Sequence, residues 1–140
     1  MSTPHYRILV VEDNPNDVEL LRMALHEADV DFEFTVIDDG GEALAFVEKQ
    51  SRPESRPDLA ILDLNLPRRD GVEVLNGMRA NPLFSDVPVA VFSSSSLPRE
   101  RARVEALHIR RYIQKPTDLD EFLKIGGAVK ELLSETSESH

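Results

Sequence analysis

The chain has 140 residues, no cysteine and a formal net charge of −10 at pH 7. This length favours a single domain with a substantial core, and the lack of cysteine excludes disulfides and thiolate metal sites. The acidic balance argues against nonspecific nucleic-acid binding. The sequence has no signal-peptide pattern and no apolar run near the roughly 20 residues of a membrane span, which predicts a soluble, cytoplasmic protein.

Strands and helices are predicted to alternate along the chain. The apolar run 6–13 predicts a buried strand, and the periodic segment 14–30, opened by Asn14 and Pro15, predicts a helix. Further strands are predicted at residues 32–39, 58–64, 87–94 and 109–115. Further helices are predicted at residues 40–50, 71–81, 97–108 and 117–135, the last with Thr117 as its N-cap.

This order is a β-α unit repeated along the whole chain. Strands that alternate with helices of this length are typical of an α/β fold, a doubly wound parallel sheet of five strands with helices on both faces. In such folds the functional site lies at the carboxyl ends of the strands. The segment 135–140 is polar and predicts a frayed tail.

Polar side chains lie at the ends of four of the predicted strands: Glu12 and Asp13, then Asp63, Ser93 and Lys115. Three carboxylates in one crevice repel one another and raise each other's pKa unless a cation neutralises them. Hard oxygen ligands suit Mg²⁺, which is commonly held by one or two carboxylates, waters and a phosphate. An exposed carboxylate can form a covalent phosphoryl intermediate, while a hydroxyl and an ammonium suit phosphoryl oxygens. The pattern therefore indicates a phosphoryl-transfer site with Asp63 as metal ligand and nucleophile.

Each of these residues also has a simpler interpretation. An aspartate at a strand end is usually a turn or cap residue, and Ser93 with the serines after it resembles a helix N-cap. Tyr112 alone would be core packing and Lys115 a solvated charge. The fold argues against these interpretations together, because it brings the strand ends to one crevice.

Four stretches, in order, resemble the receiver domain of two-component response regulators: ILVVEDN, LAILDLNLP followed by DG, VPVAVFSSS and YIQKP. The resemblance covers essentially residues 7–134 and implies a flavodoxin-like (βα)5 fold. It implies that Glu12 and Asp13 are the acidic metal pair and that Asp63 accepts the phosphoryl group. It also implies that Asn65 gives its backbone carbonyl to Mg²⁺.

The remaining roles implied by the resemblance concern signalling. Ser93 matches a hydroxyl switch residue, Tyr112 a rotating aromatic and Lys115 the lysine of the site. We expect a phosphoacceptor domain rather than an enzyme, with self-phosphorylation from small donors and autodephosphorylation. Its donor would be a sensor histidine kinase, and the sequence is similar to single-domain regulators associated with bacterial phytochromes.

The expected organisation is an N-terminal arm at 1–6, a receiver domain at 7–134, a disordered tail at 135–140 and no output domain. The resemblance leaves open whether the chain is an end-point regulator or an intermediate that passes phosphate on in a phosphorelay. It also implies a cis peptide bond between Lys115 and Pro116, which would aim the lysine into the pocket.

Two other protein classes share parts of this pattern. A phosphatase of the haloacid-dehalogenase type places a second acid two residues after its nucleophile, on the first strand, but here that position is Asn65 on the third strand. A flavin-binding module needs an anion-binding loop after the first strand. This chain has Glu12, Asp13 and Asp17 there, which would repel a phosphate that lacks a metal ion.

The last predicted helix carries two apolar stripes. Leu119, Phe122, Val129 and Leu133 would face the sheet, while Ile125, Ala128 and Leu132 form a second stripe. The second stripe either packs beneath a neighbouring helix or serves as a protein interface. The interface hypothesis predicts a homodimer through the helix 97–108, the strand 109–115 and the helix 117–135, with a rim of arginines.

Overall fold

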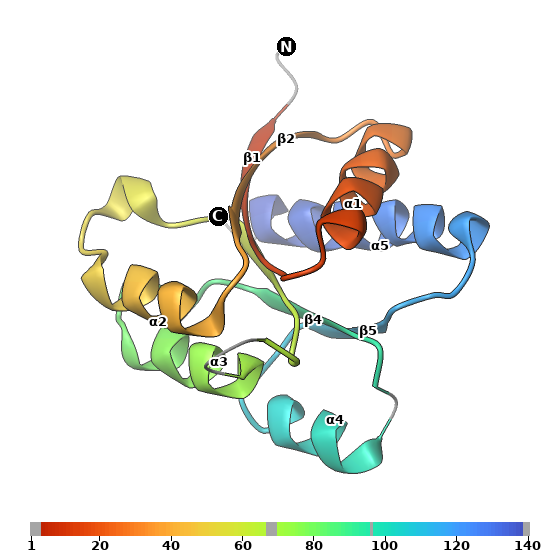
Figure 1. Ribbon diagram of the computed structural model, residues 1–140. Coiled ribbons are helices and arrows are strands. Elements are labelled where there is room, and N and C mark those ends of the chain that lie inside the picture. Colours follow the sequence, from red (N-terminus) through yellow and green to blue (C-terminus); the bar gives the residue numbers. More distant parts are fainter. Residues whose placement is uncertain (1–3, 67–69, 96, 139–140) are drawn as a thin grey trace.

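The computed structural model describes residues 4–66, 70–95 and 97–138. Its strands are β1 (His5–Val11), β2 (Asp31–Ile37), β3 (Leu59–Leu62), β4 (Val89–Ser93) and β5 (Arg111–Gln114). Its helices are α1 (Pro15–Glu27), α2 (Gly40–Lys49), α3 (Gly71–Ala80), α4 (Pro98–Glu105) and α5 (Leu119–Glu138), with a short 3₁₀ helix η1 (Pro53–Ser55). The five strands are parallel, in the order β2-β1-β3-β4-β5 (Figure 1). The predicted doubly wound fold is confirmed.

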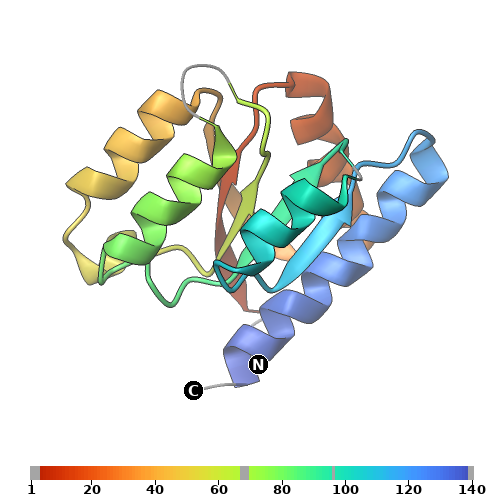
Figure 2. The same ribbon diagram turned by 90° about the horizontal axis from the view of Figure 1, so that it is seen from below.

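Helices cover both faces of the sheet. Helices α1 and α5 lie on one face, and α2, α3 and α4 lie on the other (Figure 1, Figure 2). Along β1, Ile8 and Val10 join the core beneath α1 and α5, while Leu9 and Val11 join the core beneath α2 and α3. Because the strand is buried on both faces, its sequence is an unbroken apolar run.

Side-chain caps fix where the helices begin. Asn14 accepts a hydrogen bond from the Asn16 N–H at 3.0 Å, and Asp70 accepts one from the Glu73 N–H at 3.0 Å. The predicted cap of α5 at Thr117 is wrong. The carboxylate of Asp118 accepts the Glu121 N–H at 2.9 Å, so the helix begins one residue later.

The two ends of the chain differ from the predicted boundaries. Strand β1 begins at His5, inside the segment predicted as an arm, and its register pairs His5 with Asp31 of β2. Helix α5 continues to Glu138, past residue 134. Residues 1–3, the 67–69 part of the predicted turn, Ser96 and residues 139–140 lie outside the described residues. Within the described chain, no helix is both long and apolar enough to span a membrane.

The second apolar stripe of α5 lies beneath α1. Ile125 and Leu132 are only 7% and 5% exposed and share one core cluster with Leu21 and Leu25 of α1. The helices cross closely at Gly126, where a Cβ atom would lie 2.0 Å from the carbonyl oxygen of Ala24. The prediction that this stripe forms a dimer interface is therefore wrong, because the neighbouring helix already covers it.

The sheet-facing stripe is confirmed except at its first member. Phe122, Val129 and Leu133 are buried against the sheet, and the ring of Phe122 meets that of Phe92 edge to face, with centroids 5.4 Å apart. Leu119 is half exposed, because α5 begins there and its first turn has not yet reached the sheet.

Candidate functional site

Backbone hydrogen bonds carry the functional residues one position beyond the strands. The N–H of Glu12 donates to the carbonyl of Ile37 at 3.0 Å, and that of Asp63 donates to the carbonyl of Val11 at 2.9 Å. On the other side of the sheet the Lys115 N–H donates to the Ser93 carbonyl at 2.7 Å. These bonds extend the parallel ladders, so the residues that follow β1, β3 and β5 meet at one edge.

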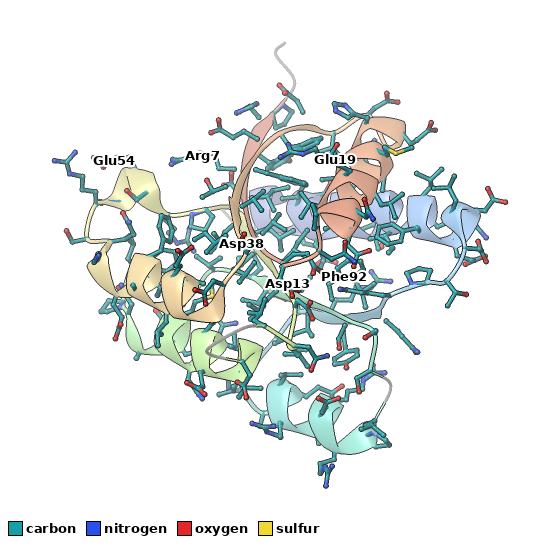
Figure 3. The ribbon with its side chains drawn as sticks, in the orientation of Figure 1. Arg7, Asp13, Glu19, Asp38, Glu54 and Phe92 are labelled. Carbon is teal, nitrogen blue, oxygen red and sulfur yellow. The ribbon has the colours of Figure 1, made fainter. Side chains whose placement is uncertain are left out.

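Three carboxylates gather at this edge. Glu12, Asp13 and Asp63 each offer an oxygen atom, and these atoms all lie within 4.8 Å of one another. Glu12 and Asp63 are 2% and 4% exposed, whereas Asp13 is exposed. Asp13 also lines an open surface pocket with Glu19 and Asp38, and all three are labelled in Figure 3. The structure thus brings together the three predicted acids, two of them buried and one open to solvent.

The donor set fits a divalent cation. Glu12 Oε1 is buried, and no group in the described chain donates to it with good hydrogen-bond geometry, although Lys115 Nζ lies 2.7 Å away. A buried carboxylate oxygen without a hydrogen bond is costly unless a cation satisfies it. Oxygen ligands of this kind suit Mg²⁺ or a similar hard cation.

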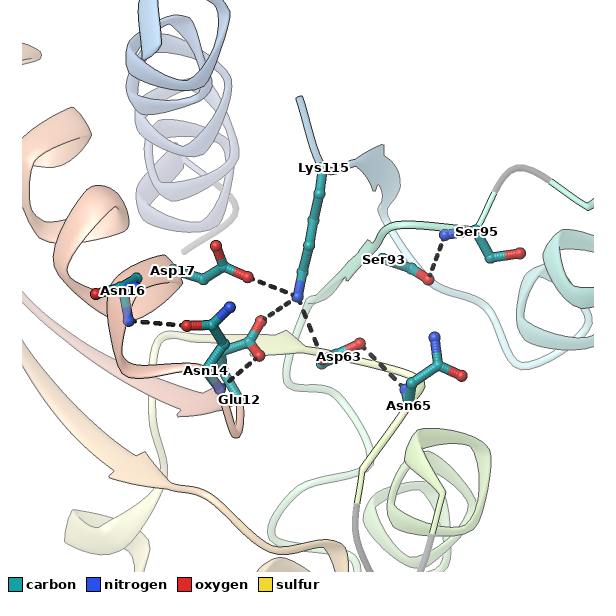
Figure 4. Close-up of polar contacts among 9 residues, drawn as sticks. All are labelled: Glu12, Asn14, Asn16, Asp17, Asp63, Asn65, Ser93, Ser95 and Lys115. Carbon is teal, nitrogen blue, oxygen red and sulfur yellow. Dashed lines mark hydrogen bonds and ion pairs between the residues drawn. The ribbon is translucent and has the colours of Figure 1, made fainter. Parts of the chain in front are cut away.

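Lys115 reaches into the carboxylates. Its Nζ lies 2.7 Å from Glu12 Oε1, 2.9 Å from Asp17 Oδ2 and 3.3 Å from Asp63 Oδ2 (Figure 4). The peptide bond to Pro116 is trans, so the predicted cis bond is wrong. The cis bond is not needed, because the ladder bond to Ser93 already places the end of β5 beside the site, and the long side chain spans the rest.

The site shifts two pKa values upward. Burial raises the pKa of Glu12 to about 7, and the charge of Asp63 adds to this effect, while the close contact with the Lys115 ammonium opposes it. Burial alone would lower the pKa of Lys115, but its contacts with Glu12, Asp17 and Asp63 outweigh burial and raise that pKa. The lysine therefore stays charged at neutral pH, and Glu12 holds a proton more tightly than an exposed glutamate does.

Asp17 is the site residue that the sequence did not reveal as a partner of Lys115. The expectation was only that its charge would repel a phosphate. Its position could have been inferred, because Asn14 as N-cap and Pro15 as first residue place Asp17 on the first turn of α1, at the carboxyl edge of the sheet. What the sequence does not contain is the direction of the Lys115 side chain.

The turn after β3 is closely packed around Asp63. The Asn65 N–H donates to Asp63 Oδ1 at 3.1 Å, and the Gly71 N–H donates to the Leu64 carbonyl at 3.0 Å. A Cβ atom on Gly71 would lie 2.3 Å from the Asp63 carbonyl oxygen. The first residue of α3 thus contacts the backbone of the candidate phosphoacceptor.

Ser93 and Tyr112 both contact the backbone of Ser95. The buried Ser93 hydroxyl accepts the Ser95 N–H at 3.1 Å, and the Tyr112 hydroxyl donates to the Ser95 carbonyl at 2.9 Å. Helix α4 begins at Pro98 with Leu97 as its N-cap and has no side-chain cap, so Ser93 is not a helix cap. The backbone of one residue, Ser95, therefore connects the two predicted switch residues.

Comparisons with known proteins agree with this geometry. Residues 8–125 match the family described as the response regulator receiver domain. Response regulator Rcp1 from Synechocystis sp. is 34% identical over 137 residues, which cover 96% of this chain and 93% of Rcp1. The crystal structure of the phosphorylated cyanobacterial phytochrome response regulator RcpA is similar with a TM-score of 0.83 and 36% identity, covering 95% of this chain and 96% of RcpA.

Two further solved structures contain a metal ion. The Mn²⁺-bound form of Rcp1 has a TM-score of 0.78 and 34% identity, covering 89% of this chain and 91% of that chain. The receiver domain of the sensor histidine kinase PA1611 from Pseudomonas aeruginosa, with magnesium in its active-site cleft, has a TM-score of 0.68 and 26% identity, covering 89% and 97%. With its sheet order, its acidic edge and these matches, the chain belongs to the receiver-domain family of two-component response regulators.

Proposed function

We propose that Asp63 accepts a phosphoryl group from the phosphohistidine of a sensor histidine kinase, with Mg²⁺ bound beside it. The observation that supports this most directly is the set of three carboxylates with oxygens within 4.8 Å, one of them at the end of the central strand β3. In the reaction a carboxylate oxygen of Asp63 forms a bond to phosphorus as the phosphorus–nitrogen bond of the donor breaks, and the imidazole leaves with those electrons.

Glu12, Asp13, Asp63 and the backbone carbonyl of Asn65 would hold the metal. Bound there, Mg²⁺ would neutralise the carboxylates that an anionic donor has to approach. Lys115 would balance charge on one phosphoryl oxygen. The Ser93 hydroxyl accepts the Ser95 N–H and would donate its own proton to another phosphoryl oxygen.

The proposed output is a change in the surface near α4 and β5. If the Ser93 hydroxyl turns toward the phosphoryl group, its bond to the Ser95 N–H is lost, and the carbonyl of the same residue accepts from the Tyr112 hydroxyl. Tyr112 is half-buried, and the guanidinium of Arg101 lies 5.3 Å from its ring centroid. A local change at the strand end would thereby reach the surface of α4.

Acetyl phosphate with and without Mg²⁺ tests the acceptor, with intact mass as the readout. Wild type should gain a single phosphoryl adduct only when Mg²⁺ is present, and Asp63→Asn should gain none. A full adduct on Asp63→Asn, or on wild type in excess EDTA, would contradict the assignment.

The proposed kinase partner is a bacterial phytochrome, because RcpA is described as a phytochrome response regulator and another similar structure, at 29% identity, as a bacteriophytochrome response regulator.

A homodimer through α4, β5 and α5 remains a proposal, now based on charge rather than on the buried stripe. Arg110 pairs with Glu135 at 3.4 Å and Arg111 with Glu131 at 3.6 Å on this face. Exposed pairs of this kind can exchange partners between two copies at little cost. Sedimentation of wild type and Arg111→Glu, with and without phosphorylation, tests it.

A further inference from the structure

Lys115 has one carboxylate partner outside the candidate metal site. Its Nζ contacts Glu12 and Asp63, which belong to the three clustered carboxylates, and also Asp17 Oδ2 at 2.9 Å, which does not (Figure 4). Asp17 comes from the first turn of α1, whereas the three clustered acids follow the ends of β1 and β3. The ammonium thus joins two separate groups of acids.

The ammonium and a metal ion compete for the same carboxylates. In the structure Lys115 neutralises part of the charge on Glu12 and Asp63. A divalent cation held by those two residues and Asp13 takes over that neutralisation and repels the ammonium. Metal binding therefore requires the lysine to give up contacts with Glu12 and Asp63.

A lysine in this position needs another partner when it gives up those contacts. Its side chain is only 14% exposed, and a partly buried ammonium without a partner is costly. Asp17 is 16% exposed, is already in contact with the lysine, and offers no oxygen to the cluster of three. No movement of α1 is needed for this contact to remain.

We propose that Asp17 is a positioning residue that retains the Lys115 ammonium when a divalent cation occupies the carboxylates of Glu12, Asp13 and Asp63. The inference rests on the metal site proposed above and adds to it a role for a residue outside that site. It predicts that Asp17 favours metal binding through the lysine, and not merely by adding negative charge.

A double-mutant cycle with Mg²⁺ as the titrant separates these two effects, with affinity measured by isothermal titration calorimetry at fixed ionic strength. Asp17→Asn should weaken Mg²⁺ binding about three- to tenfold, the size expected for one partly exposed ion pair. Lys115→Met should bind Mg²⁺ more tightly than wild type, because the competing ammonium is gone. In that background Asp17→Asn should change the affinity by less than about twofold.

Glu27→Gln is the matched control. The substitution removes the same charge from the same helix, but Glu27 is exposed and lies in the last turn of α1, away from the clustered carboxylates. The control should bind Mg²⁺ like wild type, and melting curves without Mg²⁺ should show each variant folded.

The outcomes are distinct. Asp17→Asn could bind Mg²⁺ as tightly as wild type does, or it could lose the same Mg²⁺ affinity in the wild-type and Lys115→Met backgrounds. In either case Asp17 does not act through the lysine, and the inference fails while the metal site stands. If wild type itself binds no Mg²⁺, the proposed metal site fails and the inference with it.

Discussion

A single methyl group at Gly71 should displace Asp63, the proposed phosphoacceptor. A Cβ atom there would lie 2.3 Å from the Asp63 carbonyl oxygen and 2.8 Å from the Leu64 Cα. Both are backbone atoms, so neither can turn aside as a side chain can. Restoring an ordinary contact near 3.4 Å requires the turn after β3 to move by about 1 Å relative to α3. The same movement would disturb the Asn65 N–H, which donates to Asp63 Oδ1.

The expected effect on chemistry is large. A misplacement of about 1 Å can cost roughly 100-fold in rate when reactants must be held in line. Overpacking of this kind also destabilises a fold by about 1–3 kcal/mol. We therefore expect Gly71→Ala to remain folded at low temperature and to gain the acetyl-phosphate adduct on the order of 100-fold more slowly. Intact mass against time, well below the melting temperature of the variant, measures the rate.

Gly77→Ala is the matched control on the same helix. Its Cβ would lie 2.4 Å from Leu44 Cδ1, the far end of a flexible side chain that can rotate away. This variant should phosphorylate at nearly the wild-type rate. A wild-type rate for Gly71→Ala, or an equal loss in Gly77→Ala, would refute the argument that backbone contact at Gly71 sets the position of Asp63.

Four further outcomes are expected. Gly126→Ala should lower the free energy of unfolding by about 3 kcal/mol, because its Cβ would meet a backbone carbonyl of α1. Gly127→Ala has open space around its Cβ and should raise that free energy by about 0.5–1 kcal/mol, with both variants measured by urea unfolding. Arg79→Met should lower the free energy of unfolding by about 2–4 kcal/mol in the same assay. The Arg79 guanidinium donates to four backbone carbonyls, two in the segment after α3 and two in the segment after α4. Ser93→Ala should still accept phosphate but lose any phosphorylation-dependent change in the Tyr112 resonances, followed by NMR. Added Mg²⁺ should raise the melting temperature of wild type and not that of Asp13→Asn, because a ligand that binds the folded state stabilises it.

The sequence was sufficient for the fold and for most of the site. Apolar runs of strand length between periodic helical segments predicted the parallel sheet, and parallel strands place their carboxyl ends at one edge. Glu12, Asp13 and Asp63 could therefore be assigned to one place without any knowledge of side-chain positions, and the structure brings them within 4.8 Å. The convergence of these three acids follows from the path of the backbone alone, and for that reason it could be predicted from the sequence.

The failures concern which surfaces and side chains meet. Helical periodicity showed that Ile125 and Leu132 lie on an apolar stripe, but periodicity does not say whether a stripe faces a neighbouring helix or a second molecule. The partner of α5 depends on the crossing of two helices far apart in the sequence, at Gly126. The contact of Lys115 with Asp17 likewise depends on how a long side chain crosses the crevice from β5 to α1.

Both of these misjudged features involve the same helix. The buried face of α1, with Leu21 and Leu25, covers the stripe of α5 that could otherwise have been a dimer interface. The first turn of α1 presents Asp17 to Lys115. The close crossing at Gly126 holds Ala24 of α1 against α5, and Asp17 belongs to the same continuous helix as Ala24. The packing of α1 on α5 therefore has two consequences. It removes an apolar surface of α5 from solvent, and it places the Asp17 carboxylate beside Lys115.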